Sequence, residues 1–271
     1  LRTMTTIVAD TGDLTAIARL KPIDATTNPS LITKALIHPD NEALMSETMS
    51  RHRGDVDAVI DELTVQIGCN ILALIEGRVS TEVDARLSYD TQATIDKALS
   101  FMEAYQKAGI DSERVLIKMA ATWQGIEAAR YLETQGIHCN LTLLFGQHQA
   151  IACADAGVTL ISPFVGRILA WQKRQQNSQN VPASDDMGVQ SVQLIYQYYK
   201  QHGYKTQVMG ASFRSTEQIL ALAGCDLLTI APNLIDELAA MDVEVTRQLS
   251  PSMSMDLPDM AKVSLTHDEF S

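Results

Sequence analysis

Short apolar runs alternate with amphipathic stretches along almost the whole chain. The runs are rich in Val, Ile, Leu and Thr, and they are too continuously apolar for strands with one face in water. This pattern is typical of parallel strands covered by helices. Strands are predicted at residues 5–10, 23–28, 78–84, 114–120, 139–145, 158–164, 206–212 and 227–232.

The stretches between these runs have helical periodicity, and most of them end near a Gly. In one of them, Ile95, Leu99, Met102 and Tyr105 share a face, and Gly109 supplies a C-terminal stop. Helices are predicted at residues 92–110, 124–137, 147–158, 191–204 and 215–226.

Three segments depart from the simple alternation. Residues 41–76 predict one or two helices with no strand between them, which makes this connection longer than a minimal βα unit. Residues 171–188 are polar and interrupted by Pro and Gly, as is typical of a loop, and residues 250–271 have no clear periodicity.

Eight strands with intervening helices predict an α/β fold, a closed (β/α)8 TIM barrel, in a single domain that spans residues 1–271. In such barrels the chemistry takes place at the carboxyl ends of the strands. Polar residues occupy these ends, where a purely structural strand would continue apolar. They are Asp10, Asn28, Glu82, Lys118, Thr142, Ser162 and Ser212.

Lys118 stands inside the apolar run at residues 114–120 and is the only lysine centred in a predicted strand. Burial disfavours the cationic form of an amine, and a neutral amine can attack a carbonyl to form an imine. Such an imine allows aldol chemistry without a metal. The structural alternative is a snorkelling side chain, or an ion pair with Glu82 or Asp10.

Aldol chemistry also needs proton carriers, and Glu82 and Asp10 are the carboxylates best placed to supply them. Asp10 could instead cap a helix, because Asp10 and Asp13 both precede the helical stretch LTAIARL. Asn28 could be a turn residue before Pro29.

Arg167 and Arg214 follow the sixth and seventh predicted strands, near the rim where barrels often bind phosphate. Each alone would more often be a solvated surface charge. Because Ser162 and Ser212 lie nearby, the pattern favours a sugar-phosphate site.

Composition excludes several classes of protein. The 271 residues carry a formal net charge of −12, which argues against a general nucleic-acid or anionic-membrane surface. No apolar run approaches the roughly 18 residues needed to span a bilayer.

The four cysteines form no CxxC pair, which predicts a reducing compartment, and we expect a cytoplasmic protein. The histidines show no zinc-binding spacing.

As a set, the motifs ADTGD, DATTNPSL, GRVSTEVDARLSYD, LIKMAATWQGI, CNLTLLF, LISPFVGRI, GYKTQVMGASFR and GCDLLTIAP closely resemble the transaldolase family, in particular its longer bacterial and eukaryotic type. The resemblance covers almost all of residues 5–237. It implies a circularly permuted class I aldolase barrel that uses neither cofactor nor metal. The implied reaction transfers a dihydroxyacetone unit from sedoheptulose 7-phosphate to glyceraldehyde 3-phosphate, giving erythrose 4-phosphate and fructose 6-phosphate.

The resemblance also implies roles for single residues. Lys118 matches the Schiff-base lysine, Glu82 and Thr142 match a pair that works through a water, and Asp10 matches the acid/base at the C4 hydroxyl. Six further positions match groups that bind the substrate or line its channel, and Phe164 matches an aromatic residue near the active site. The six are Asn28, Asn140, Ser162, Arg167, Ser212 and Arg214.

Two alternatives to transaldolase stay open at this point. One is a lyase of the same superfamily that cleaves fructose 6-phosphate, and the other is a catalytically weak barrel that binds sugar phosphates. After the THDEF motif the chain has a shorter C-terminal segment than is usual for the family. A homodimer is possible.

Overall fold

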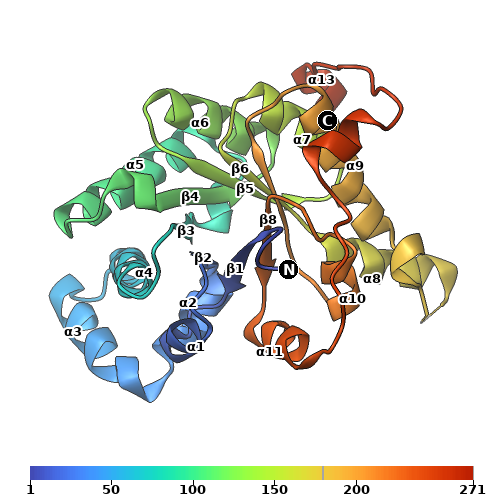
Figure 1. The fold of residues 1–271 in the computed structure, drawn as a ribbon. Helices are drawn as coiled ribbons and strands as arrows, with labels where there is room; N and C mark the ends of the chain where they lie inside the picture. Colours follow the sequence, from blue (N-terminus) through green and yellow to red (C-terminus); the bar gives the residue numbers. More distant parts are fainter. Residues whose placement is uncertain (179, 271) are drawn as a thin grey trace.

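The computed structural model describes residues 1–178 and 180–270. In these residues eight parallel strands form a closed barrel in the order β1 to β8, with β1 paired to β8 (Figure 1). The strands are β1 (Thr6–Asp10), β2 (Asp24–Thr26), β3 (Val79–Glu82), β4 (Val115–Ala120), β5 (Cys139–Leu144), β6 (Leu160–Pro163), β7 (Gln207–Gly210) and β8 (Leu227–Ile230).

Helices surround the barrel (Figure 1). They are α1 (Leu14–Leu20), α2 (Pro29–Leu36), α3 (Glu42–His52), α4 (Val56–Leu72), α5 (Thr91–Lys107), α6 (Trp123–Thr134), α7 (Gln147–Asp155), α8 (Val165–Gln176), α9 (Met187–Gln201), α10 (Thr216–Leu220), α11 (Pro232–Ala240), α12 (Pro251–Met255) and α13 (His267–Phe270). Short 3₁₀ turns occupy Pro39–Asn41, Ala85–Leu87, Ser112–Arg114 and Ala183–Asp185.

The barrel interior changes from apolar to polar along its axis. A buried apolar cluster, which we call the plug, consists of Val8, Leu116, Leu160, Met209 and Leu227. Because side chains alternate along a strand, the next inward residues lie two positions further toward the carboxyl end. Four of these are polar: Asp10, Lys118, Ser162 and Thr229.

Charged and polar side chains meet at the amino ends of the strands, on the other side of the plug. Arg78 Nη2 donates hydrogen bonds to Asp24 Oδ2 (2.9 Å) and to Gln207 Oε1 (3.1 Å). Arg78 precedes β3, while Asp24 and Gln207 begin β2 and β7. The three side chains therefore link distant parts of the barrel wall at this end.

The predicted barrel and all of its strands are confirmed, and residues 41–76 contain α3 and α4 with no strand between them. Three details of the predicted pattern are wrong. Residues 171–176 belong to α8 rather than to a loop, because an amphipathic helix begins at Val165. The helix predicted at 215–226 ends at Leu220. Leu99 is 40% exposed, because the buried face of α5 is centred on Ala98.

The segment without clear periodicity, residues 250–271, contains two short helices in its described part. Helix α12 packs against α9, and α13 packs against α7. Phe270 fixes α13, since its ring lies 5.4 Å from that of Trp123 and 5.3 Å from that of His148.

In the described part of the chain, no helix has both the length and the apolar composition that crossing a bilayer requires.

Close contact between α4 and α5 depends on a glycine. The hydroxyl of Tyr105, on α5, is fully buried and lies 2.6 Å from the Thr81 hydroxyl of β3. A Cβ atom at Gly68, on α4, would stand 1.8 Å from the same Tyr105 hydroxyl. Only glycine therefore allows α4 to approach this hydrogen bond.

We expect Gly68→Ala to lower the free energy of unfolding by about 2 to 3 kcal/mol, because the methyl group overpacks the α4–α5 contact. Tyr105→Phe alone removes one hydrogen bond and should cost about 1 kcal/mol. Chemical denaturation of the single and double variants measures the coupling. The double variant should be more stable than the sum of the two losses predicts, and simple additivity would contradict the proposed clash.

Candidate active site

The carboxyl ends of the strands bring the predicted polar residues to one mouth of the barrel. Lys118 lies near the end of β4, with Glu82 of β3 opposite it on one side and Asn140 of β5 on the other. The three residues are neighbours because β4 is paired with β3 on one edge and with β5 on the other.

Lys118 is 6% exposed, and its amine has two close partners. Nζ lies 2.9 Å from Glu82 Oε2 and donates to the Thr27 carbonyl oxygen at 3.1 Å. The ion pair that the sequence offered as a structural alternative is therefore present. A close carboxylate offsets much of the cost of burying the cation, and it also gives the amine an adjacent acceptor for a proton.

Asn140 is held in one orientation by two hydroxyl groups. Its Nδ2 donates to Ser80 Oγ at 3.0 Å, and its Oδ1 accepts from Ser162 Oγ at 2.7 Å. All three residues are buried. The amide orientation is thus fixed beside the Lys118 amine.

Thr142, two residues beyond Asn140 on β5, has a buried hydroxyl with no hydrogen-bond partner among the described residues. A buried hydroxyl without a partner is costly, and such groups often mark places where a ligand or a water binds. Thr142 is therefore available to a bound molecule at the mouth.

The two aspartates before α1 have different roles. Asp13 caps the helix, since its Oδ1 accepts from the N–H groups of Thr15 (2.9 Å) and Ala16 (3.1 Å). Asp10 is therefore free of the capping role that the sequence left open. Its Oδ1 accepts from Thr26 Oγ1 at 3.1 Å.

A second hydroxyl supports this contact. Thr229 Oγ1 of β8 lies 2.7 Å from Thr26 Oγ1. Because the Thr26 proton goes to the Asp10 carboxylate, Thr26 accepts from Thr229. The two hydroxyls orient Asp10 toward the centre of the mouth.

Asn28 caps α2, with its Oδ1 accepting from the Leu31 N–H at 3.0 Å. Cavities lie on both sides of α2. One, of about 550 Å³, is lined by Thr27, Asn28 and Glu82, and the other, of about 630 Å³, reaches Asp10. The polar groups of the mouth therefore open into two lateral spaces.

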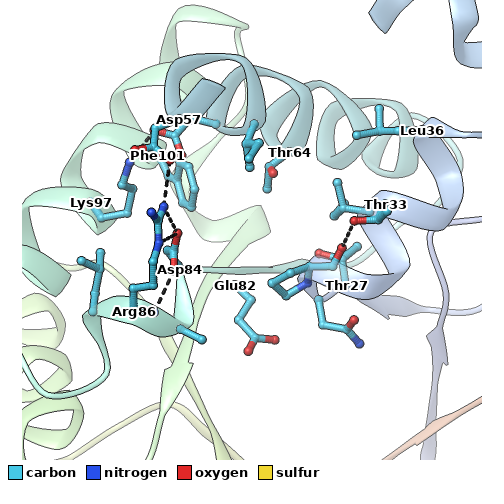
Figure 2. Close-up of a pocket in the computed structure, with 17 residues that line it drawn as sticks. Thr27, Thr33, Leu36, Asp57, Thr64, Glu82, Asp84, Arg86, Lys97 and Phe101 are labelled. Carbon is cyan, nitrogen blue, oxygen red and sulfur yellow. Dashed lines mark hydrogen bonds and ion pairs between the residues drawn. The ribbon is translucent and has the colours of Figure 1, made fainter. Parts of the chain in front are cut away.

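The outer wall of the smaller cavity is ion-paired. Arg86 donates to Asp57 and to Asp84, and hydrogen bonding from Arg86 lowers the pKa of the Asp84 carboxyl. Lys97 pairs with Asp61. Figure 2 shows the Glu82 carboxylate pointing away from Asp84 and Arg86. Glu82 therefore pairs with Lys118, while Arg86 and Lys97 pair with aspartates.

Arg167 and Arg214 are exposed side chains on adjoining segments of the same rim. Gly166, next to Arg167, donates its N–H to the Ser212 carbonyl at 3.0 Å. A Cβ at Gly166 would stand 2.6 Å from Arg214 Cγ, so the Arg214 side chain passes directly over this glycine. Two guanidinium groups on neighbouring segments can bind an anion.

Phe164 directly follows β6 at the mouth and meets Phe145 edge to face, with ring centroids 5.6 Å apart. Leu143, within β5, has a φ of +54°, and the pairing of β5 with β6 is irregular at this point. Leu143 and Phe145 are both more than 40% exposed. This side of the mouth is therefore apolar.

Sequence reasoning missed the hydroxyls that orient the site residues: Ser80, Thr26 and Thr229. It considered the polar residues near the carboxyl ends of the strands and the positions that match the family, and none of these three is among them. The signal that could have found them is the alternation of side chains, which puts further polar residues of neighbouring strands inside the barrel.

The arrangement combines an amine, two carboxylates and several hydroxyl and amide groups that can bind a polyhydroxy compound. Among the described residues, no group of three or more His, Cys, Asp and Glu side chains is arranged to hold a metal ion. The geometry suits nucleophilic attack by the amine with proton transfer by the carboxylates.

Comparisons with known proteins agree with this chemistry. The family model described as Transaldolase/Fructose-6-phosphate aldolase matches residues 7–269. A protein named Transaldolase from Methylococcus capsulatus is 56% identical over 268 residues, which cover 95% of this chain and 82% of that protein. A second, from Acidobacterium capsulatum, is 59% identical, with 92% and 78% covered. Transaldolase B of Pasteurella multocida is 55% identical, with 100% and 87% covered. The chain belongs to the transaldolase/fructose-6-phosphate aldolase family.

Proposed function

We propose that the chain is a transaldolase that moves a dihydroxyacetone unit from sedoheptulose 7-phosphate to glyceraldehyde 3-phosphate through an imine on Lys118. The observation that carries the proposal is the Lys118 amine, buried at the barrel mouth and 2.9 Å from the Glu82 carboxylate. Family membership supports the same reaction.

The first step joins the donor to the protein. Lys118 gives one proton to Glu82, and the neutral amine attacks the C2 carbonyl of the ketose. A second nitrogen proton passes to the C2 oxygen, Glu82 returns its proton to the same oxygen, and loss of water leaves the protonated imine. Thr142, whose hydroxyl has no partner among the described residues, can bind the water that leaves.

The second step breaks the bond between C3 and C4. Asp10 removes the proton of the C4 hydroxyl, C4 becomes an aldehyde, and the electron pair of the broken bond flows into the protonated imine. The product on Lys118 is an enamine of dihydroxyacetone, and the shorter aldose leaves. Asn28 and Asn140 bind the hydroxyls of the retained unit.

The third step reverses this chemistry with an acceptor. The enamine carbon attacks the acceptor aldehyde, Asp10 returns the proton to the new hydroxyl, and hydrolysis of the imine frees Lys118. Arg167 and Arg214 bind the substrate phosphate, with Ser162, Ser212 and Phe164 along the path to it. Assembly as a homodimer and a cytoplasmic location stay predictions from the sequence.

Lys118→Met should abolish the transfer, because the thioether cannot form an imine. The measurement is borohydride reduction in the presence of fructose 6-phosphate, followed by digestion and mass spectrometry. The native chain should carry a dihydroxyacetone-sized adduct on Lys118, and the variant should carry none.

The matched control is Lys200→Met. Lys200 also forms a largely buried ion pair, with Asp226, but it lies away from the mouth. This variant should keep both the adduct and the turnover. An active Lys118→Met variant would exclude the proposed imine, and binding without any adduct on the native chain would favour a sugar-phosphate binder.

Asp10→Asn should lower kcat by about 10² to 10⁴, because general acid–base catalysis commonly contributes that much. The imine should still be trapped, since Asp10 acts after it forms. Asp13→Ala should instead lower the free energy of unfolding by about 1 kcal/mol through loss of the α1 cap, with kcat retained. Steady-state kinetics and thermal unfolding of both variants check the division of roles, and the reverse pattern would overturn it.

A further inference from the structure

The turn after β7 places Arg214, and its backbone is strained. Ser212 has a φ of +62°, a left-handed conformation that disfavours residues with a side chain. Such a conformation persists only where the surroundings hold it in place. Two hydrogen bonds do so: Gly166 donates to the Ser212 carbonyl, and the Arg214 N–H donates to Gln218 Oε1 at 2.7 Å.

Gln218 connects this turn to a buried carboxylate. Its Nε2 donates to Asp186 Oδ2 at 2.6 Å, and both residues are at most 2% exposed. Asp186 can only accept, and the Arg214 N–H can only donate. A side-chain amide, which does both, is therefore suited to join them.

Asp186 belongs to the start of α9. Its Oδ1 accepts from the N–H groups of Gly188 (2.8 Å) and Val189 (3.3 Å). A Cβ at Gly188 would stand 2.2 Å from the Val165 carbonyl oxygen, so the start of α9 is packed tightly on the start of α8. The first turn of α8 carries Arg167. The contact between Asp186 and Gln218 thus fixes both arginine-bearing segments relative to each other.

We propose that Gln218 is a positioning residue for phosphate recognition, with Asp186 as its anchor. It holds the main chain of Arg214 so that the side chain passes over Gly166, next to Arg167, before substrate arrives. Gln218 does not touch the substrate. This inference rests on the phosphate role proposed above for the two arginines.

Gln218→Leu should raise KM for fructose 6-phosphate about tenfold, because the Arg214 main chain loses its acceptor. The kcat/KM for fructose, which has no phosphate, should stay within about twofold of the native value. A merely structural defect would lower kcat/KM for both sugars equally, and that result would overturn the proposal.

Gln197→Leu is the matched control for loss of a buried amide. Gln197 donates to the Pro258 carbonyl at 2.9 Å, and within residues 1–178 and 180–270 it has no hydrogen bond to the arginine segments. It should leave the preference for the phosphorylated sugar unchanged, and an equal loss of preference in this variant would count against a specific role for Gln218.

An exchange of groups tests the contact itself. Gln218→Glu alone would place a second carboxylate against that of Asp186 and should lose the phosphate preference. Adding Asp186→Asn supplies an N–H donor to the introduced carboxylate and keeps the oxygen that caps α9. The double variant should recover the preference to within about threefold, and a folded double variant no better than Gln218→Glu would overturn the proposal.

Binding separates this inference from the proposed reaction. In a Lys118→Met background no imine forms, so calorimetry reports the affinity for fructose 6-phosphate alone. Adding Gln218→Leu should weaken that affinity about tenfold even if the native chain proves inactive. An unchanged affinity would overturn the role of Gln218, whereas an inactive native chain would overturn only the proposed reaction.

Discussion

The ion pair between Lys118 and Glu82 constrains how the centre of this barrel can be built. Two charges inside a protein are tolerated only when they contact each other closely and their remaining hydrogen-bonding groups are satisfied. The Thr27 carbonyl accepts a hydrogen bond from the amine. The neighbouring inward positions are polar, and hydrogen bonds join Ser80, Asn140 and Ser162. Two residues further down the strands, the inward side chains are apolar. The pair therefore lies at the boundary between a packed core and a polar chamber that opens at the mouth.

Much of this arrangement could be predicted from the sequence. The eight apolar runs indicate the strands, and the barrel fold then brings their polar ends to one rim. The sequence predicted both roles of Lys118, the ion pair with Glu82 and the nucleophile. Both roles require that the strands of Lys118 and Glu82 be neighbours. The face of α5 was harder to predict, because a periodic pattern does not say whether Ala98 or Leu99 is nearer the core. In the structure the small residue packs against the barrel wall.

Other features depend on distances that no local pattern contains. Asp10 and Asp13 both precede α1 closely enough to cap it, and only the backbone of the turn decides that Asp13 does. The contact between Thr26 and Thr229 joins residues 203 positions apart. The hydrogen bond between Gln218 and Asp186 joins two helices, one of which begins at Met187, inside the segment predicted as a loop. Such contacts follow from barrel closure and helix packing rather than from propensity.

The plug has a consequence for the order of events. Val8, Leu116, Leu160, Met209 and Leu227 fill the barrel below the polar chamber, and the ion-paired Arg78 lies beneath them. A sugar phosphate therefore has no passage along the axis, and it must enter and leave by the same mouth. In a transfer of this kind the first product occupies the space that the acceptor needs. In the proposed mechanism one aldose therefore departs before the other binds, and Lys118 holds the three-carbon unit in the interval.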